Sequence, residues 1–212
     1  MQTSSVRITW RILVAVCALW AAGVGRAESG CVPPQGFKDI PHPTVAPVDQ
    51  LVSHTEEIVI NKPLAVVLAE AEQTSLNQAI KKSDSLPGVA GTYELTSGGF
   101  GQTGTRRLVC LTDGTTTEEQ VLMSTRTKSS AEFRYVVWNY TTPKARPILY
   151  GVGDFVRTDL GDGRTRVRWT YSFQLNRSRF PGYLGAFGDY LFRVTFLDRE
   201  YAAMMRRTLG KE

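Results

Sequence analysis

Residues 164–175 read RTRVRWTYSFQL, and this stretch decides the fold. From position 167 onward the odd positions are apolar or aromatic, whereas Arg, Thr, Ser or Gln occupy the even ones. Such an alternation is typical of a β-strand that is buried on one face and solvated on the other. We therefore expect the odd-numbered aromatic side chains to be buried and the even-numbered arginines to be exposed, namely Trp169, Tyr171 and Phe173 against Arg166 and Arg168.

The pattern changes after Pro181-Gly182. Apolar residues then recur at spacings of three and four, which form the stripe of one amphipathic helix. The members of this stripe are Tyr183, Phe187, Leu191, Val194, Leu197, Tyr201 and Met204. The two patterns together predict an antiparallel sheet, solvated on one face, whose apolar face receives a long C-terminal helix.

Residues 1–27 have the features of a signal peptide. Arg7 and Arg11 precede an apolar run from Ile12 to Ala22, and Gly25-Arg26-Ala27 supplies small residues where a signal peptidase cleaves. We predict cleavage after Ala27 and a periplasmic or secreted protein, with the bacterial periplasm favoured. An uncleaved anchor stays open as the alternative, although a span needs about 20 apolar residues and Arg26 interrupts this run.

Much of the positive charge belongs to this leader. Cleavage removes Arg7, Arg11 and Arg26 and no acidic residue, so the formal net charge falls from +5 to +2. A nucleic-acid partner would require a strong and clustered basic surface. We therefore expect no nucleic-acid partner, and no stable membrane span once the leader is gone.

Two cysteines follow the leader, Cys31 and Cys110. In an oxidising compartment they could form a disulfide, and the sequence leaves open whether they pair or stay two thiols. Residues 28–50 are rich in proline and poor in large apolar side chains, so we expect a flexible arm. Residues 51–209 then make one domain of ordinary size.

Within this domain the element order is a strand, one or two short helices, six strands and the long helix. Asn61 and Pro63 mark a helix start, and Leu86-Pro87-Gly88 ends the helical part. Asp113-Gly114 and Asp162-Gly163 are dipeptides that tight hairpins prefer. The expected strands cover residues 52–60, 89–96, 103–112, 116–127, 131–141, 148–160 and 164–175, and the short helices cover 64–76 and 77–82.

This order and several motifs resemble the START-like superfamily, also labelled SRPBCC, which includes the polyketide cyclase and dehydrase group. Ile60-Asn61-Lys62-Pro63 is similar to the family's motif after the first strand, residues 104–114 to its G-x-x-R-x-V-x-L-x-D-G pattern, and Val167-Arg168-Trp169 to its V-x-W. The chain departs from the family in having Lys62 where Ala is usual and in lacking a Trp after Pro63.

The resemblance implies a helix-grip fold of the α+β class. In this fold a curved antiparallel sheet of about seven strands wraps around the long C-terminal helix. It also implies a cavity between sheet and helix for a lipid, polyketide, sterol or similar apolar molecule.

The sequence offers little for catalysis or for metal binding. His42 lies in the Pro-rich segment, and we expect His54 on the first strand to be a surface residue rather than a base. No G-x-S-x-G motif and no paired His/Cys spacing is present, and the glycines of residues 98–104 suit a hairpin better than a phosphate loop. We predict no catalytic residue, no metal and no cofactor.

Charged residues on apolar strand phases are the strongest signal for a ligand site. Arg107, Glu119 and Asp154 each share a phase with apolar neighbours, so we expect all three to face the cavity. Unpaired burial would cost several kcal/mol each, so Arg107 should pair with Glu119 or meet a polar end of the ligand. A one-residue slip in register would send any of them to solvent. The expected walls are Tyr135, Val167, Trp169, Tyr171 and Phe173.

Three functions fit these observations. The first is an exported carrier that holds a small apolar molecule. The second is a cyclase or dehydrase type of enzyme, in which Asp154, Glu119 or Tyr135 would move a proton. The third is an accessory protein that binds another exported protein through its sheet or its Pro-rich arm. The carrier is favoured because few polar groups converge on a mostly apolar pocket.

Overall fold

The structure of the protein is a computed structural model that describes residues 30–210, so the expected leader lies outside the described residues. The strands are β1 (Val52–Ile60), β2 (Val89–Glu94), β3 (Arg106–Leu111), β4 (Thr116–Arg126), β5 (Ser130–Trp138), β6 (Ile148–Asp159) and β7 (Thr165–Leu175). The helices are α1 (Leu64–Gln73), α2 (Leu76–Ala79), α3 (Ala186–Phe192), the π-helical η4 (Arg193–Tyr201) and α4 (Ala202–Thr208), with short 3-10 turns η1 (Val48–Gln50), η2 (Pro143–Ala145) and η3 (Gly182–Leu184). This is the expected element order.

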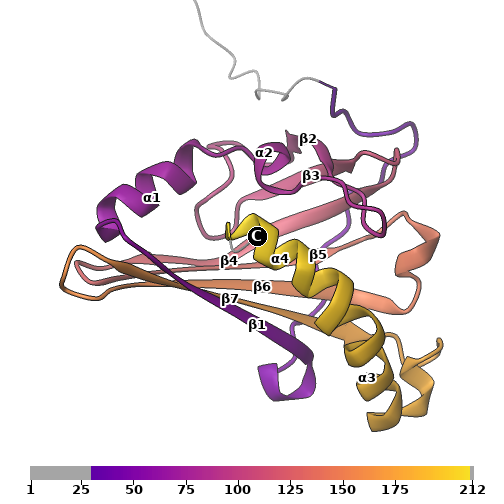
Figure 1. The fold of residues 1–212 in the computed structure, drawn as a ribbon. Helices are drawn as coiled ribbons and strands as arrows, with labels where there is room; N and C mark the ends of the chain where they lie inside the picture. The colour runs from indigo at the N-terminus through magenta and orange to yellow at the C-terminus, as the bar shows by residue number, and fades with distance from the viewer. Residues whose placement is uncertain (1–29, 211–212) are drawn as a thin grey trace, which may run out of the picture.

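The seven strands form one antiparallel sheet in the order β1-β7-β6-β5-β4-β3-β2. The sheet curves, and α3, η4 and α4 run as one C-terminal helix across its concave side, with α1 and α2 above (Figure 1). The first and last strands of the chain, β1 and β7, pair with each other at one edge of the sheet. The C-terminal helix contacts β1 at this edge. The α+β helix-grip fold expected from the sequence is confirmed.

The alternation of β7 is confirmed as well. Trp169, Tyr171 and Phe173 are buried on the concave face, whereas Arg166 and Arg168 are exposed. Together with residues of the C-terminal helix, these aromatic side chains form the largest apolar cluster of the described chain. The period of two therefore reported the correct face for this strand.

The expected helix stripe is wrong at its beginning. Tyr183 and Phe187 are each 60% exposed, and the side chains that pack on the sheet are instead Phe192, Leu197, Met204 and Met205. Two features explain the shift. The chain before Phe192 extends past the end of the sheet (Figure 1), and η4 has the wider i→i+5 hydrogen-bonding pattern, which rotates a stripe counted at 3.6 residues per turn.

The Pro-rich segment packs on the convex face of the sheet, although the sequence predicts a flexible arm. Cys31 forms a disulfide with Cys110 of β3, which settles the question that the sequence left open. Farther along the segment, Trp138 donates its indole N–H to the Ile40 carbonyl at 3.2 Å, and the Ala46 amide donates to the Tyr150 hydroxyl at 2.9 Å. These contacts cover a second apolar cluster, which consists of Leu51, Val136, Trp138, Tyr150 and Val152.

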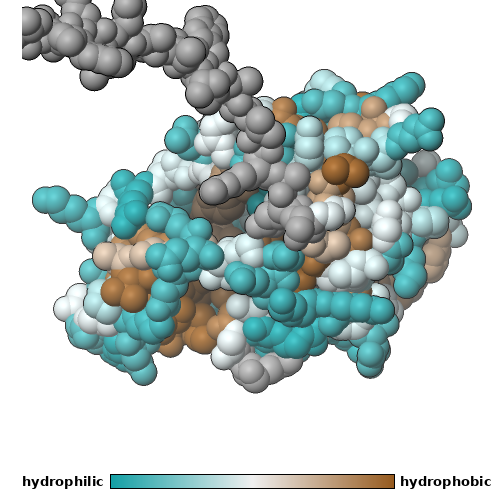
Figure 2. Space-filling model, turned by 90° about the horizontal axis from the view of Figure 1, so that it is seen from above, coloured by the Kyte–Doolittle hydropathy of each residue, from teal (hydrophilic) through white to brown (hydrophobic). Residues whose placement is uncertain are grey.

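Viewed from the side of α1 and α2, the surface is mostly hydrophilic, with apolar side chains showing between the hydrophilic ones (Figure 2). Within residues 30–210, no helix has both the length and the apolar character that crossing a membrane requires. The largest exposed apolar side chains cluster elsewhere, around η3 and α3.

Candidate functional site

An ion pair between a partly buried arginine and a buried glutamate lies on the concave face of β3 and β4. The sheet register places Arg107 opposite Glu119. Arg107 donates from Nε to Glu119 Oε2 at 2.7 Å, and its Nη2 lies 2.6 Å from the same oxygen. The expected pairing is therefore confirmed. Because each charge neutralises the other, the pair supplies a polar group to the concave face without a free charge.

Four tyrosines gather beside this pair on the concave side. The rings of Tyr135 and Tyr171 lie 6.3 Å apart, and those of Tyr171 and Tyr201 lie 4.6 Å apart. The hydroxyl of Tyr140 lies near that of Tyr171, above Gly151 of β6. Glycine at this position lets the two rings approach the strand closely, because a β-carbon there would lie 2.8 Å from the Tyr171 hydroxyl and 3.0 Å from that of Tyr140.

Burial raises the pKa of all four phenols. For Tyr135 the negative charge of Glu119 raises the pKa further. The phenols therefore stay protonated through the physiological range. In this state the Tyr135 phenol could donate a proton in a cyclase-type reaction but could not accept one.

Asp154 does not lie with this group. Its neighbour Gly153 pairs with Tyr171 on the concave face, so Asp154 points to the convex face, opposite Arg134 and Thr170. The expected phase is wrong because β6 is apolar on both faces. Tyr150 and Val152 are buried, but beneath the Pro-rich segment on the convex face. A strand that is covered on both faces has no apolar-polar alternation from which its concave face could be predicted. Burial raises the pKa of Asp154, and one of its oxygens has no hydrogen-bond partner among the described residues.

The expected walls divide into two groups. Trp169, Tyr171 and Phe173, with Val167 in the same phase, are 2–4% exposed. The ring of Phe173 lies 5.5 Å from that of Phe192 of the C-terminal helix, so the helix covers this half of the concave face. Tyr135 is only partly buried, and its neighbours on that face are also partly buried rings, Phe133 and Phe155.

The most informative residue of this half-open region, Arg157, was missed at the sequence level. The register places it opposite Val167, on the concave face, with its guanidinium 4.9 Å from the ring centre of Phe155. No ion pair or hydrogen bond joins this guanidinium to another residue of 30–210. Burial lowers its pKa. The orientation of Arg157 could have been predicted from the hairpin at Asp162-Gly163. This hairpin pairs Asp159 with Thr165, so Arg157 lies opposite Val167 and shares its face of the sheet.

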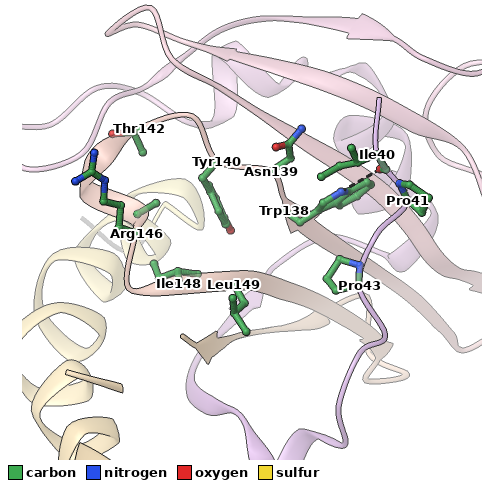
Figure 3. Close-up of a pocket in the computed structure, with 11 residues that line it drawn as sticks. Ile40, Pro41, Pro43, Trp138, Asn139, Tyr140, Thr142, Arg146, Ile148 and Leu149 are labelled. Atoms are coloured by element: carbon green, nitrogen blue, oxygen red, sulfur yellow. Dashed lines mark hydrogen bonds between the residues drawn. The ribbon is translucent and has the colours of Figure 1, made fainter. Parts of the chain in front are cut away.

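A pocket of about 430 Å³ opens at the end of the sheet, between the Pro-rich segment and the β5–β6 connection. Figure 3 shows Trp138 and the prolines on one side, Thr142 and Arg146 on the other, and Tyr140 between them. The pocket could not be predicted from the sequence, because a segment distant in sequence forms one wall. Its lining residues are Ile40, Pro41, Pro43, Trp138, Asn139, Tyr140, Thr142, Ala145, Arg146, Ile148 and Leu149.

His54 joins β1 to the C-terminal helix. Its Nδ1 lies 2.7 Å from Asp198 Oδ1, and its Nε2 lies 3.1 Å from Glu56 Oε1. Arg206 approaches the same Glu56 oxygen at 3.0 Å. The side chain is only 18% exposed, so His54 is less of a surface residue than expected. Both ring nitrogens are engaged with carboxylates, which suits a structural link better than a general base.

Comparisons with known proteins found similar structures but no related sequence. No family model matches the chain, and no relative was found among curated proteins. A hypothetical protein from Helicobacter pylori superposes with a TM-score of 0.50 at 12% identity, over 74% of this chain and 83% of that one. The Zhui aromatase/cyclase from a Streptomyces species gives a TM-score of 0.47 at 14% identity, over 75% and 92%, and Ara h 8.0201 gives 0.42 at 14%, over 74% and 97%.

These comparisons define the class of structure only. The likeness to the Helicobacter pylori protein shows a shared fold only, which agrees with the sheet order and the C-terminal helix described above. Any activity or ligand must therefore be argued from the residues of this chain.

Proposed function

We propose that the protein is an exported carrier of a small apolar molecule that has an acidic group. The molecule would lie on the half-open part of the concave face, against Phe133, Tyr135 and Phe155. The observation that carries the proposal is Arg157, a guanidinium on an aromatic surface with no carboxylate partner within residues 30–210. Because a half-buried cation without a counter-ion is costly, an anionic ligand group is its expected partner.

The two arginines of this face have different roles in the proposal. Arg107 is neutralised by Glu119, and its guanidinium also lies 3.8 Å from the ring centre of Phe100. It therefore supports one edge of the site and is not available as the main anion ligand. Arg157 keeps its charge for the ligand, so the acidic end is expected there rather than at Arg107.

A cyclase-type reaction has less support from the same geometry. Asp154 lies on the other face of the sheet, and the phenol of Tyr135 stays protonated. Glu119 remains, but Arg107 holds it in an ion pair. A general base needs a free acceptor within reach of the substrate proton, and none of the three residues expected for this role, Asp154, Glu119 and Tyr135, is a free acceptor on this face.

Export is part of the proposal. The disulfide between Cys31 and Cys110 supports it, because such bonds persist in oxidising compartments. The expected mature chain begins at Glu28. Intact-mass measurement of protein recovered from the exporting cell tests this, and a mass that includes residues 1–27 would argue against a cleaved leader.

The ligand proposal is tested with a matched pair of fluorescent probes, a long-chain carboxylic acid and the corresponding alcohol. The protein should bind the acid at micromolar concentration, and Arg157→Gln should weaken this binding at least tenfold, as expected for a lost charge-assisted contact. Binding of the alcohol should change little. Arg168→Gln is the control, because Arg168 is exposed on the opposite phase of β7.

Two results would overturn the proposal. The first is a wild-type protein that takes up neither probe and carries no organic molecule in mass spectra of its extract. The second is equal weakening of acid and alcohol by Arg157→Gln, which would mean that the residue shapes the site without recognising an anion.

A further inference from the structure

An exposed aromatic surface lies around η3 and α3, far along the chain from the site on β3–β6. We call it the aromatic end. Four of its side chains are 59–60% exposed and one is 37% exposed. Its members are Phe180, Tyr183, Leu184, Phe187 and Tyr190. Clustered apolar exposure of this kind marks an interaction surface, whereas isolated exposed side chains do not.

The aromatic end exists because the helix extends past the sheet. Phe192 is the first helical side chain that packs on the sheet, where it contacts Phe173. Residues before it have no strand beneath them, and in Figure 1 α3 extends beyond the end of β1 and β7. The rest of the described chain therefore covers the five side chains only in part.

Close contacts hold the aromatic end in shape. Arg177 donates two hydrogen bonds to the Asp189 carboxylate, of 2.6 and 2.9 Å, which connect the loop after β7 to α3. A β-carbon at Gly188 would lie 1.9 Å from the Pro181 carbonyl oxygen, so loop and helix are in direct backbone contact. The rings of Phe180 and Tyr183 lie 6.1 Å apart. A surface that is ordered before binding loses little conformational entropy on docking.

The charge around the aromatic end is positive. Residues 139–149 and 174–193 meet at this end of the sheet, where the backbone N–H of Asn176 donates a hydrogen bond to the Pro147 carbonyl at 2.7 Å. Together these two segments have a net charge of +4, from five basic residues and one acidic residue. These are Lys144, Arg146, Arg177, Arg179 and Arg193, with Asp189. The other residues of 30–210 contain 16 basic and 17 acidic residues, a net charge of −1. Arg177 and Arg193 are paired with Asp189 and Asp198, so the basic residues of these two segments without an ion pair within residues 30–210 are Lys144, Arg146 and Arg179.

We propose that the aromatic end docks on the surface of an anionic phospholipid bilayer. Exposed Phe and Tyr beside arginines match the boundary between headgroups and acyl chains, where rings enter the apolar layer and cations stay with the phosphates. Arg179 and Arg146 carry this role best, because neither has an ion pair within residues 30–210. The inference does not rest on the proposed ligand, since none of the five side chains belongs to that site.

The test is co-sedimentation of the exported, leader-free protein with vesicles of phosphatidylglycerol and phosphatidylcholine, compared with vesicles of phosphatidylcholine alone. We expect binding to the anionic vesicles and little to the neutral ones. Tyr183→Glu/Phe187→Glu should reduce binding at least tenfold. Arg179→Gln should reduce it about fivefold, the usual effect of one basic residue near an anionic surface. Val59→Glu is the control, because Val59 is 41% exposed on β1, away from the aromatic end.

The substituted side chains are exposed, so the variants should fold, and circular dichroism checks this. If the glutamate variant fails to fold, Tyr183→Ser/Phe187→Ser replaces it. Equal binding to both kinds of vesicle would overturn the charge argument. Binding that Tyr183→Glu/Phe187→Glu leaves unchanged, or no binding to either vesicle, would overturn the docking proposal, and in the latter case a protein partner would be the occupant to seek.

Discussion

The ring of Tyr135 lies directly over Gly153. A β-carbon built on Gly153 would come within 2.2 Å of Tyr135 Cζ and within 2.4 Å of its hydroxyl oxygen. Two residues earlier, Gly151 stands in the same relation to Tyr171. The two glycines lower the concave surface of β6, so that rings from β5 and β7 can lean across it.

Gly153→Ala should therefore destabilise the protein, because the added methyl group displaces the Tyr135 ring. Overpacking of this kind costs about 1–3 kcal/mol, and urea unfolding measures the loss. Tyr135→Leu in the same chain should recover part of it, since the smaller side chain vacates the space above the strand. If the losses of the two single variants simply add in the double variant, the ring and the glycine are not coupled as described.

The fold was accessible from the sequence wherever one face of an element is buried and the other is solvated. The alternation in β7 placed Trp169 inside and Arg168 outside, and the two hairpin dipeptides located the β3–β4 and β6–β7 hairpins. The pairing of Arg107 with Glu119 was one of two outcomes expected from the same logic, because charges on an apolar phase should pair with each other or meet a polar end of the ligand.

Long-range contacts decided what the sequence could not show. The phase of Asp154 depends on which face of β6 the Pro-rich segment covers, and a disulfide between residues 79 positions apart holds that segment in place. The exposed Phe187 belongs to an apolar stripe, but a stripe does not reveal where the sheet beneath it ends. To place Asp154 and Phe187 correctly, one must know which distant part of the chain packs against each of them.

Phe173→Ala should reduce the free energy of unfolding by about 3–5 kcal/mol, the usual range for a core phenylalanine. The side chain is 3% exposed and its ring contacts those of Phe192, Phe196 and Tyr201. Phe187→Ala provides a matched control, because this ring is 60% exposed, and its loss should stay below about 0.5 kcal/mol. Similar losses for the two variants in denaturant unfolding would contradict the packing of the C-terminal helix.

Reduction of the disulfide between Cys31 and Cys110 should loosen the Pro-rich segment and destabilise the protein. Loss of a native disulfide costs about 2–5 kcal/mol in small secreted domains. Unfolding with and without reductant measures this cost, and hydrogen exchange at the Trp138 indole N–H, which bonds to Ile40, reports on the segment itself. Cys31→Ser/Cys110→Ser should show the same stability in both conditions. A wild-type protein indifferent to reductant would mean that the segment is held by its other contacts.

Asp154→Asn should stabilise the protein at neutral pH. Burial raises the pKa of Asp154 in the folded state above its ordinary value of 3.8, and the nearby Glu132 raises it further. The folded protein therefore binds this proton more tightly than the unfolded chain does, so the contribution of Asp154 to stability is full below pH 3.8 and is lost as pH rises through the folded-state pKa. Asparagine keeps the shape without the charge.

The gain from Asp154→Asn should consequently shrink as the pH falls and should vanish in acid, where the carboxyl group is protonated in both states. Asp162 provides a control of opposite sign, because the side-chain hydrogen bond from Arg164 lowers the pKa of its carboxyl group. Asp162→Asn should lose a little stability at neutral pH and none in acid. Thermal unfolding of both variants from pH 7 to pH 3 measures these trends. An Asp154→Asn variant less stable than the wild type at pH 7 would show that Asp154 has a stabilising charge partner on the convex face, against the placement described above.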